Sequence, residues 1–193
     1  MMKPILAIAL AALILFGASF GLNGIAAKNA QEAHITMMQT LLPGSETFTV
    51  ERYDGDDANI VSVHKGETGY VIETCVYGYA GEITMLIGVS NEGKVTGLVV
   101  RDMAETFGLG GNALTDHVFL AQFLNGSEFA VAGAEADAFS GATGSAEVSD
   151  SATEIDAISG ATVTTKAIIR SVNSAVAYVT GADIESSATS WGG

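Results

Sequence analysis

The sequence predicts an α+β fold in which an N-terminal transmembrane helix precedes one extracytoplasmic domain, built from an antiparallel sheet and flanking helices. Three observations support this prediction. An uncharged apolar run opens the chain, short β-type runs separated by turn residues fill its middle, and one amphipathic segment lies near its C-terminus. The 193 residues suffice for one domain with an appendage, not for two full domains.

Composition excludes several classes of protein. Acidic residues outnumber Lys and Arg by 22 to 8, which gives a formal net charge of -14 and a field that repels a phosphate backbone. The single Cys75 cannot form an intrachain disulfide, and His34, His64 and His117 lack the spacing of zinc ligands. Nucleic-acid binding, disulfide scaffolds and metal sites are therefore not predicted.

Residues 1–28 are predicted to form a single-pass anchor in the cell (inner) membrane. The run from Pro4 to Ala27 carries no charge, and about 20 apolar helical residues span a bilayer. The short N-terminal flank and the acidic remainder favour a main domain on the extracytoplasmic, periplasmic side. A cleaved signal peptide is the alternative, but the run exceeds the roughly 7 to 15 residues of a signal core, which favours the anchor.

Residues 29–44 are predicted to form a stalk helix, because apolar residues recur there at a spacing near 3.6 until Pro43-Gly44 ends the pattern. Five runs rich in Val, Ile, Thr and Tyr follow, with turn residues between them, which indicates an antiparallel meander. These runs are Thr47 to Tyr53, Ile60 to His64, Gly69 to Tyr77, Glu82 to Val89 and Lys94 to Arg101.

The rest of the domain 45–181 is predicted to contain two helices and one loop. A short helix is expected from Asp116 to Leu124, with Thr115 as its cap. Residues 125–156 are acidic and rich in Gly, Ala and Ser, which is typical of a mobile surface loop. The second helix is expected from Thr164 to Val179, and residues 182–193 are expected to be a flexible tail.

The segment before the second helix reads Asp-Ala-Ile-Ser-Gly-Ala-Thr from Asp156 to Thr162. Gly160 allows a tight turn, and a helix start beyond it leaves N–H groups unpaired with a partial positive charge. A phosphate oxygen is stabilised at such a place. The hydroxyls of Thr162, Thr164 and Thr165 can either cap the helix or bind a phosphate, and on physical grounds alone capping is the commoner role.

This segment resembles the flavinylation motif of the covalent FMN-binding domain family, whose last threonine carries FMN through a phosphoester. Here that residue is Thr162. A second stretch, Glu105-Thr106-Phe107-Gly108-Leu109-Gly110, resembles the family's Glu-Thr-Pro-Gly-Leu-Gly loop. The resemblance covers Gly69 to Val179 and is strongest to G subunits of Rnf electron-transport complexes, ahead of C subunits of sodium-pumping NADH:quinone reductases.

The resemblance also implies roles for neighbouring residues. The flavin transferase would read Asp156 during maturation, and Lys166 would offset the phosphate charge unless it is an ordinary surface lysine. The turn would be shaped by Ser159, Gly160 and Ala161, the phosphate bound by Thr164 and Thr165, and the flavin lined by Glu105, Thr106, Gly108, Leu109 and Gly110. For this last group, a plain strand-to-helix turn is the alternative.

Two features depart from the family pattern. Phe107 replaces the usual proline, which removes a fixed backbone angle and adds an aromatic ring. The segment from Asp137 to Thr143 repeats the motif within the acidic loop, but no amphipathic helix follows it. Thr162 is therefore the predicted attachment site, and Thr143 is either a minor second site or an unmodified duplication.

By resemblance, the chain is expected to be an electron-carrying flavoprotein subunit that is not catalytic alone. It would relay electrons through FMN in a ferredoxin:NAD oxidoreductase complex coupled to Na⁺ or H⁺ translocation, with other membrane and flavin subunits as partners. A C-type subunit of a quinone reductase and a standalone FMN carrier are alternatives within the same chemistry. An anchored binding or structural module is the alternative without redox chemistry.

Overall fold

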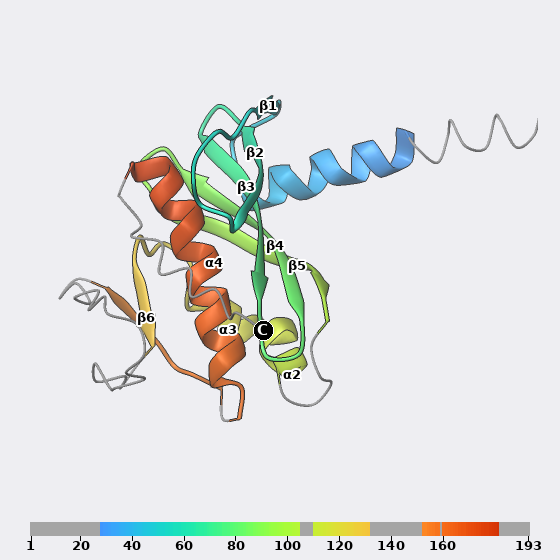
Figure 1. The fold of residues 1–193 in the computed structure, drawn as a ribbon. Helices are drawn as coiled ribbons and strands as arrows, with labels where there is room; N and C mark the ends of the chain where they lie inside the picture. The colour runs from blue at the N-terminus through green and yellow to red at the C-terminus, as the bar shows by residue number, and fades with distance from the viewer. Residues whose placement is uncertain (1–27, 105–109, 132–151, 159, 182–193) are drawn as a thin grey trace, which may run out of the picture. The chain divides into compact units, whose positions relative to one another are not determined.

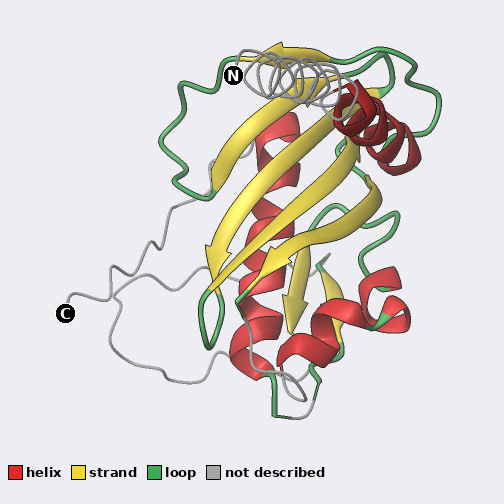
Figure 2. Cartoon of the chain, turned by 90° about the vertical axis from the view of Figure 1, so that its right-hand side faces the viewer, coloured by secondary structure: helices red, strands yellow, loops and turns green. Residues whose placement is uncertain are grey.

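The computed structural model describes residues 28–104, 110–131, 152–158 and 160–181. A five-stranded sheet forms one layer, and the helix α4 (Thr162–Thr180) packs against one of its faces (Figures 1 and 2). The predicted α+β class with an antiparallel sheet and flanking helices is confirmed. The predicted anchor lies outside the described residues except for Lys28, and no described helix is both long and apolar enough to cross a membrane.

The sheet is an antiparallel meander with the strand order β1-β2-β3-β4-β5. All five predicted runs agree with the observed strands to within two residues at each end. The first strand is nevertheless less than half as long as predicted, and before it the Glu67 carboxylate binds the backbone N–H and hydroxyl of Thr47 in place of a strand ladder. The strands are β1 (Thr49–Glu51), β2 (Ile60–Lys65), β3 (Gly69–Tyr77), β4 (Glu82–Ser90) and β5 (Val95–Met103).

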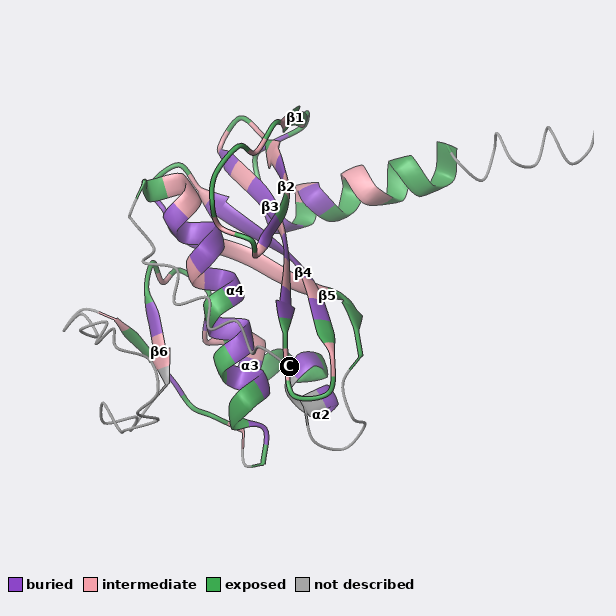
Figure 3. Ribbon diagram, in the orientation of Figure 1, coloured by how far each residue is buried: buried purple, intermediate pink, exposed green. Residues whose placement is uncertain are grey.

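The main core lies between the sheet and α4 (Figure 3). Alternate residues of β3 and β4 face the helix, and α4 faces them with the apolar stripe that its sequence predicts. Full burial of one such side chain contributes about 1.5–3 kcal/mol. The fully buried members include Ile72, Val76, Ile83, Met85 and Ile87 from the sheet and Ile168, Val172 and Ala175 from α4.

The opposite face of the sheet receives the end of the first described helix, which covers residues 28–41 and so agrees with the predicted stalk helix. The chain divides into two compact units at Met37–Met38, and the contacts described here lie within the second unit. Gly88 and Gly97 are cross-strand partners, and both lie against Leu41. The Thr96 hydroxyl donates to the Leu41 carbonyl at 2.6 Å, so the helix end is fixed directly on the sheet.

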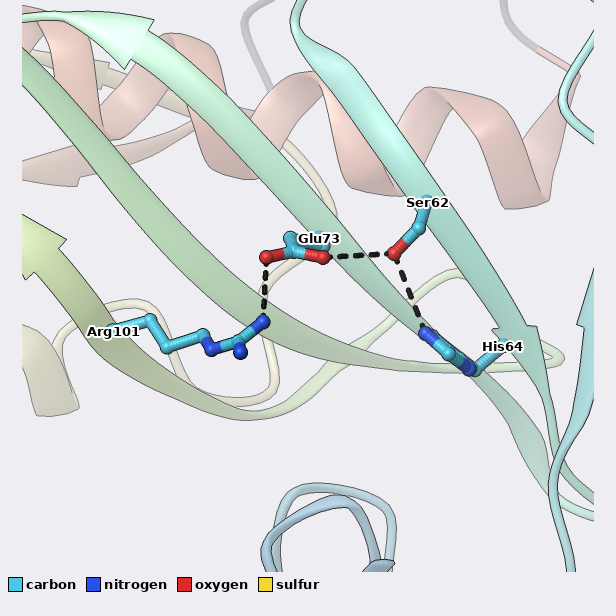
Figure 4. Close-up of polar contacts among 4 residues, drawn as sticks. All are labelled: Ser62, His64, Glu73 and Arg101. Atoms are coloured by element: carbon cyan, nitrogen blue, oxygen red, sulfur yellow. Dashed lines mark hydrogen bonds and ion pairs between the residues drawn. The ribbon is translucent and has the colours of Figure 1, made fainter. Parts of the chain in front are cut away.

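The same face carries a polar network across β2, β3 and β5 (Figure 4). The Glu73 carboxylate accepts from Arg101 at 2.7 Å and from the Ser62 hydroxyl at 2.9 Å. The Ser62 hydroxyl also lies 3.3 Å from Nε2 of His64. With both carboxylate oxygens bonded, Glu73 connects the two strands that flank β3 and β4.

Two short helices, α2 (Gly110–Thr115) and α3 (His117–Ala121), follow the sheet. The predicted short helix from Asp116 to Leu124 is present as α3, but it ends at Ala121, and the prediction of Thr115 as its cap is wrong. The cap is Asp116, whose carboxylate accepts from the N–H groups of Val118 and Phe119 at 2.8 and 3.3 Å. The Thr115 hydroxyl instead donates to the Gly111 carbonyl at 3.1 Å, within the unpredicted helix α2.

The prediction that residues 125–156 form a mobile surface loop is wrong at both ends of the segment. The strands β6 (Phe129–Val131) and β7 (Thr153–Ile155) form a parallel two-stranded sheet. Phe129 and Ile155 are buried in the main core, and the burial of these two apolar side chains holds both strands on the domain. Residues 132–151 and the predicted tail 182–193 lie outside the described residues.

Candidate functional site

The candidate site is the N-terminus of α4, which begins at Thr162, two residues earlier than predicted. Gly160 has a φ of 80° and Ala161 N–H donates to the Ile158 carbonyl at 2.9 Å, so a tight turn leads into the helix. A positive φ is a conformation that glycine adopts without steric cost. The predicted turn at Gly160 is therefore present.

No side chain among the described residues caps α4. Its N-cap residue is Ala161, which has no side-chain hydrogen bond to offer. The alternative interpretation of Thr162, Thr164 and Thr165 as caps is therefore wrong for the described structure. In the part of the chain that the structure describes, the first-turn N–H groups have no side-chain acceptor, and they carry the partial positive charge of a 19-residue helix. Such a terminus favours a bound anion.

The polar side chains of the first turn divide into exposed and buried ones. Thr162 and Lys166 are exposed, and they lie four residues apart on one face of the helix. Asp156, at the start of the motif, is also exposed. The Thr162 hydroxyl is thus accessible from solvent, with a cation one turn away.

Thr164 and Thr165 are fully buried, and their hydroxyl oxygens have no hydrogen-bond partner in the described part of the chain. A buried hydroxyl left without a partner costs about 1–3 kcal/mol. Buried polar groups of this kind call for an explanation, and a bound group missing from the structure is one of the usual ones. These two orphaned hydroxyls fit a site that is completed by a polar ligand.

Only one residue of the second predicted motif, Gly110, is described by the structure. Gly110 begins α2, which contacts α4, and Leu114 of α2 belongs to the main core. The other predicted site residues of this motif, Glu105, Thr106, Gly108 and Leu109, lie outside the described residues, as do Ser159 and Thr143. Within the described residues, no cluster of His, Cys, Asp or Glu could hold a metal ion.

Two residues that hold the motif or the strand pair before it have no signature in the sequence. Gln122 accepts a hydrogen bond from the backbone N–H of Asp156, and Asn173 binds both backbone groups of Phe129. Their partners are backbone atoms 34 and 44 residues away in sequence, so no local pattern identifies them.

The fold and the site together define an α+β domain in which a long helix begins without a side-chain cap, at an exposed threonine, and can bind an anion there. The chain belongs to the FMN-binding domain family, whose signature matches residues 78–177. The predicted family is thus confirmed. The match includes both sequence motifs and the whole of β4, β5 and α2.

Named relatives are G subunits of ion-translocating complexes. The G subunit of the ion-translocating oxidoreductase complex from Methanosarcina acetivorans is 30% identical over 74% of this chain and 72% of its own length. The G subunit of the Na⁺-translocating ferredoxin:NAD⁺ oxidoreductase complex from Acetobacterium woodii is 36% identical over 56% of this chain and 47% of its own. The proton-translocating counterpart of Clostridium ljungdahlii is 33% identical over 58% and 53%. The chain thus spans about half the length of the latter two.

Among solved structures, the crystal structure of Shewanella oneidensis NqrC is similar at a TM-score of 0.44 and 19% sequence identity. The similarity covers 75% of this chain and 73% of that one.

Proposed function

We propose that this chain is the electron-carrying flavoprotein subunit of an ion-translocating ferredoxin:NAD⁺ oxidoreductase complex, and that FMN is attached to Thr162 through a phosphoester. Family membership and the names of the relatives support the flavin and the complex. The observation that carries the attachment site is the exposed Thr162 at the first position of an uncapped helix, inside the Asp-x-x-Ser-Gly-Ala-Thr segment.

The residues of the first turn fit a phosphate ester. The unpaired N–H groups of α4 and the exposed Lys166 are suited to its negative charge. The buried hydroxyls of Thr164 and Thr165 are donors in need of an acceptor. Gly160 keeps the approach to the helix free of a side chain. When bound, a flavin accepts and passes on one or two electrons, and the protein supplies its position and electrostatic surroundings.

The covalent tether has a physical advantage for an electron carrier. A phosphoester at Thr162 holds the cofactor without enclosing its ring, so an exposed helix terminus suffices as the anchoring point. We further propose that the ring is lined by Glu105, Thr106, Gly108, Leu109 and Gly110, as the resemblance of the second motif implies. Asp156 serves recognition by the flavin transferase, and Ser159, Gly160 and Ala161 shape the turn before the attachment site.

The subunit is proposed to act within a complex and not as an enzyme alone. Other membrane and flavin subunits are its partners, and residues 1–28 anchor it with the main domain on the extracytoplasmic side. The acidic balance of the chain, -14 in formal charge, suits contact with basic partner surfaces and not with nucleic acid.

The experiment is to produce the chain with and without a flavin transferase, denature it, and look for flavin fluorescence that travels with the protein band. Wild type should fluoresce after exposure to the transferase, and its intact mass should rise by one FMN group. Thr162→Val should abolish the label, whereas the control Thr143→Val should keep it. A label that persists in Thr162→Val assigns a different residue, and an unlabelled wild type favours the module without redox chemistry.

A further inference from the structure

We propose that Gln122 and Asn173 are positioning residues for flavin attachment. The side-chain amide of Asn173 holds β6, the strand that pairs with β7, and the side-chain amide of Gln122 holds Asp156, the residue that follows β7. The inference rests on the proposed attachment of FMN to Thr162. In this inference the two residues determine the position of the attachment segment, and they contribute little to the free energy of folding.

The strand β7 requires support from the rest of the domain. It is three residues long and pairs with β6, another three-residue strand, in the register Phe129↔Thr153 to Val131↔Ile155. An isolated two-stranded pair of this length is not stable in water. β7 ends at Ile155, and the next residue, Asp156, is the first residue of the motif. The position of this small sheet therefore sets where the attachment segment begins.

Asn173 clamps β6 to α4, and the two elements run side by side (Figure 1). Its side-chain N–H donates to the Phe129 carbonyl at 3.0 Å, and its side-chain oxygen accepts from the Phe129 N–H at 3.2 Å. A carboxamide has both a donor and an acceptor, so it can bind the N–H and the carbonyl of one strand residue as a neighbouring strand would. Asn173 follows Thr162 by eleven residues on α4, or about three turns, which places both on one side of the helix.

Gln122 holds the start of the motif itself. Gln122 is the C-cap residue of α3, and its side-chain oxygen accepts from the Asp156 N–H at 2.9 Å. At the other end of the segment, Ala161 is buried in the core beneath the start of α4. The residues between Asp156 and Ala161 are thus held at both ends, and Thr162 follows immediately.

Apolar contacts hold the same elements without specifying their register. Phe129 packs on Phe123 with ring centroids 5.1 Å apart, and Ile155 is fully buried. Such burial is favourable but non-directional. The hydrogen bonds of the two amides are directional and therefore fix the position of the segment. Their removal should change the position of the segment more than the free energy of unfolding of the domain.

Placement matters for the transfer step. The Thr162 hydroxyl oxygen bonds to the flavin-bearing phosphorus of a flavin dinucleotide, the bond from that phosphorus to the nucleotide leaving group breaks, and the hydroxyl proton is released. The products are the phosphoester and a nucleoside monophosphate, with no change in oxidation state. A displacement of about 1 Å in such a reaction can cost on the order of a hundredfold in rate.

The test measures flavin transfer to the full chain by a purified transferase, with flavin dinucleotide as the donor. Gln122→Leu and Asn173→Leu should each lower kcat/KM for transfer by about tenfold or more. Gln122→Glu keeps an acceptor for the Asp156 N–H and should restore most of the rate. Asn173→Asp keeps the acceptor but loses the donor, so its rate should lie between those of wild type and Asn173→Leu.

Two controls separate positioning from loss of stability. Gln39→Leu also removes a side-chain bond to a backbone carbonyl, that of Glu46, but on other elements, and should transfer at the wild-type rate. Ile72→Val should lower stability by making a small cavity in the core while leaving the rate unchanged. Amide hydrogen exchange should rise at 152–158 in the two leucine variants and not in the controls.

The proposal is overturned if both leucine variants transfer flavin at the wild-type rate, or if Asn173→Asp does so when the leucine variants do not fold. It is also overturned if the rate falls equally in Ile72→Val at matched stability. A wild-type chain that takes no label contradicts the proposed function instead, so the two failures are distinguishable.

Discussion

At the scale of single residues, the first turn of α4 separates an exposed threonine from two buried ones. Thr162 is exposed, whereas Thr164 and Thr165 are buried without a hydrogen-bond partner in the described chain. The sequence contained a signal for this difference. Thr164 and Thr165 continue the spacing of the apolar stripe that includes Ile168, and Thr162 does not. The stripe therefore predicts which hydroxyls lie inside.

Thr165→Val tests whether the buried hydroxyl is unsatisfied before the flavin is attached. Valine has nearly the same shape, so the free energy of unfolding of the unlabelled chain should stay level or rise by about 1 kcal/mol. After labelling, the variant should lose part of the stabilisation that wild type gains, if the hydroxyl binds the phosphate. Urea unfolding of both forms gives the comparison.

Ser171→Ala is the matched control for this change. The Ser171 hydroxyl is equally buried but shares a hydrogen bond with Thr74. Its removal should lower the free energy of unfolding by about 1–3 kcal/mol, because the Thr74 hydroxyl is left unpaired. Equal destabilisation by Thr165→Val and Ser171→Ala would show that Thr165 has a partner in the unlabelled chain.

At the scale of elements, local patterns predict the long strands and the long helix well, and they fail where pairing is distant. β3 was predicted with its observed bounds because alternation and turn residues are both local signals. β6 and β7 were not predicted, because three-residue strands show no period and their pairing joins Phe129 to Thr153. The cap at Asp116 was also not predicted. Helix α2 was not expected, so the sequence pattern did not indicate that Thr115 belongs to α2 and that Asp116 begins the next helix.

Gly88→Ala should be strongly destabilising, because the added Cβ would collide with the Leu41 carbonyl oxygen. The expected loss is about 1–3 kcal/mol, the usual cost of overpacking. Gly181→Ala is the control, since a Cβ there meets nothing within 4 Å and only the φ of 68° is unfavourable. Thermal unfolding should rank Gly88→Ala well below Gly181→Ala, and the reverse ranking would mean that Leu41 does not lie on this strand.

The Glu67 carboxylate should make the connection between the first described helix and β1 dependent on pH. The Thr47 hydroxyl, at 2.6 Å, and nearby backbone N–H groups lower the pKa of Glu67. A lowered pKa means that the contribution is present above the usual pKa of glutamate and disappears as the pH falls through the lowered one. Wild type should therefore have a higher Tm than Glu67→Gln at pH 7, and the gap should close in strong acid.

The control for this pH dependence is Glu46→Gln. Glu46 joins the cluster through its backbone N–H, at 3.0 Å from the Glu67 carboxylate, and not through its side chain. Its Tm difference from wild type should therefore change less with pH. A gap between wild type and Glu67→Gln that is the same at pH 7 and in strong acid would contradict the assignment.

At the scale of the whole molecule, charge and family were predictable from composition and motifs, whereas the geometry of the site was not. The -14 formal charge follows from counting residues, and the family follows from two motifs in order. The uncapped start of α4 depends on contacts made after folding, and so do the bonds from Gln122 to Asp156 and from Asn173 to Phe129. Those contacts join residues that are far apart in the chain.

The charge imbalance itself predicts a response to salt. Like charges at this density repel one another in the compact state, and added KCl screens that repulsion. The Tm should rise as KCl increases from low to near-physiological concentration. A falling Tm over this range would mean that attractive ion pairs, such as Arg101–Glu73, outweigh the repulsion.

A helix that begins without a side-chain cap is also open to the small anions of its surroundings. Sulfate or inorganic phosphate in a buffer would compete for the same N–H groups with the flavin nucleotide that we propose is attached at Thr162. The proposed attachment should consequently be slower in phosphate than in a chloride buffer of equal ionic strength.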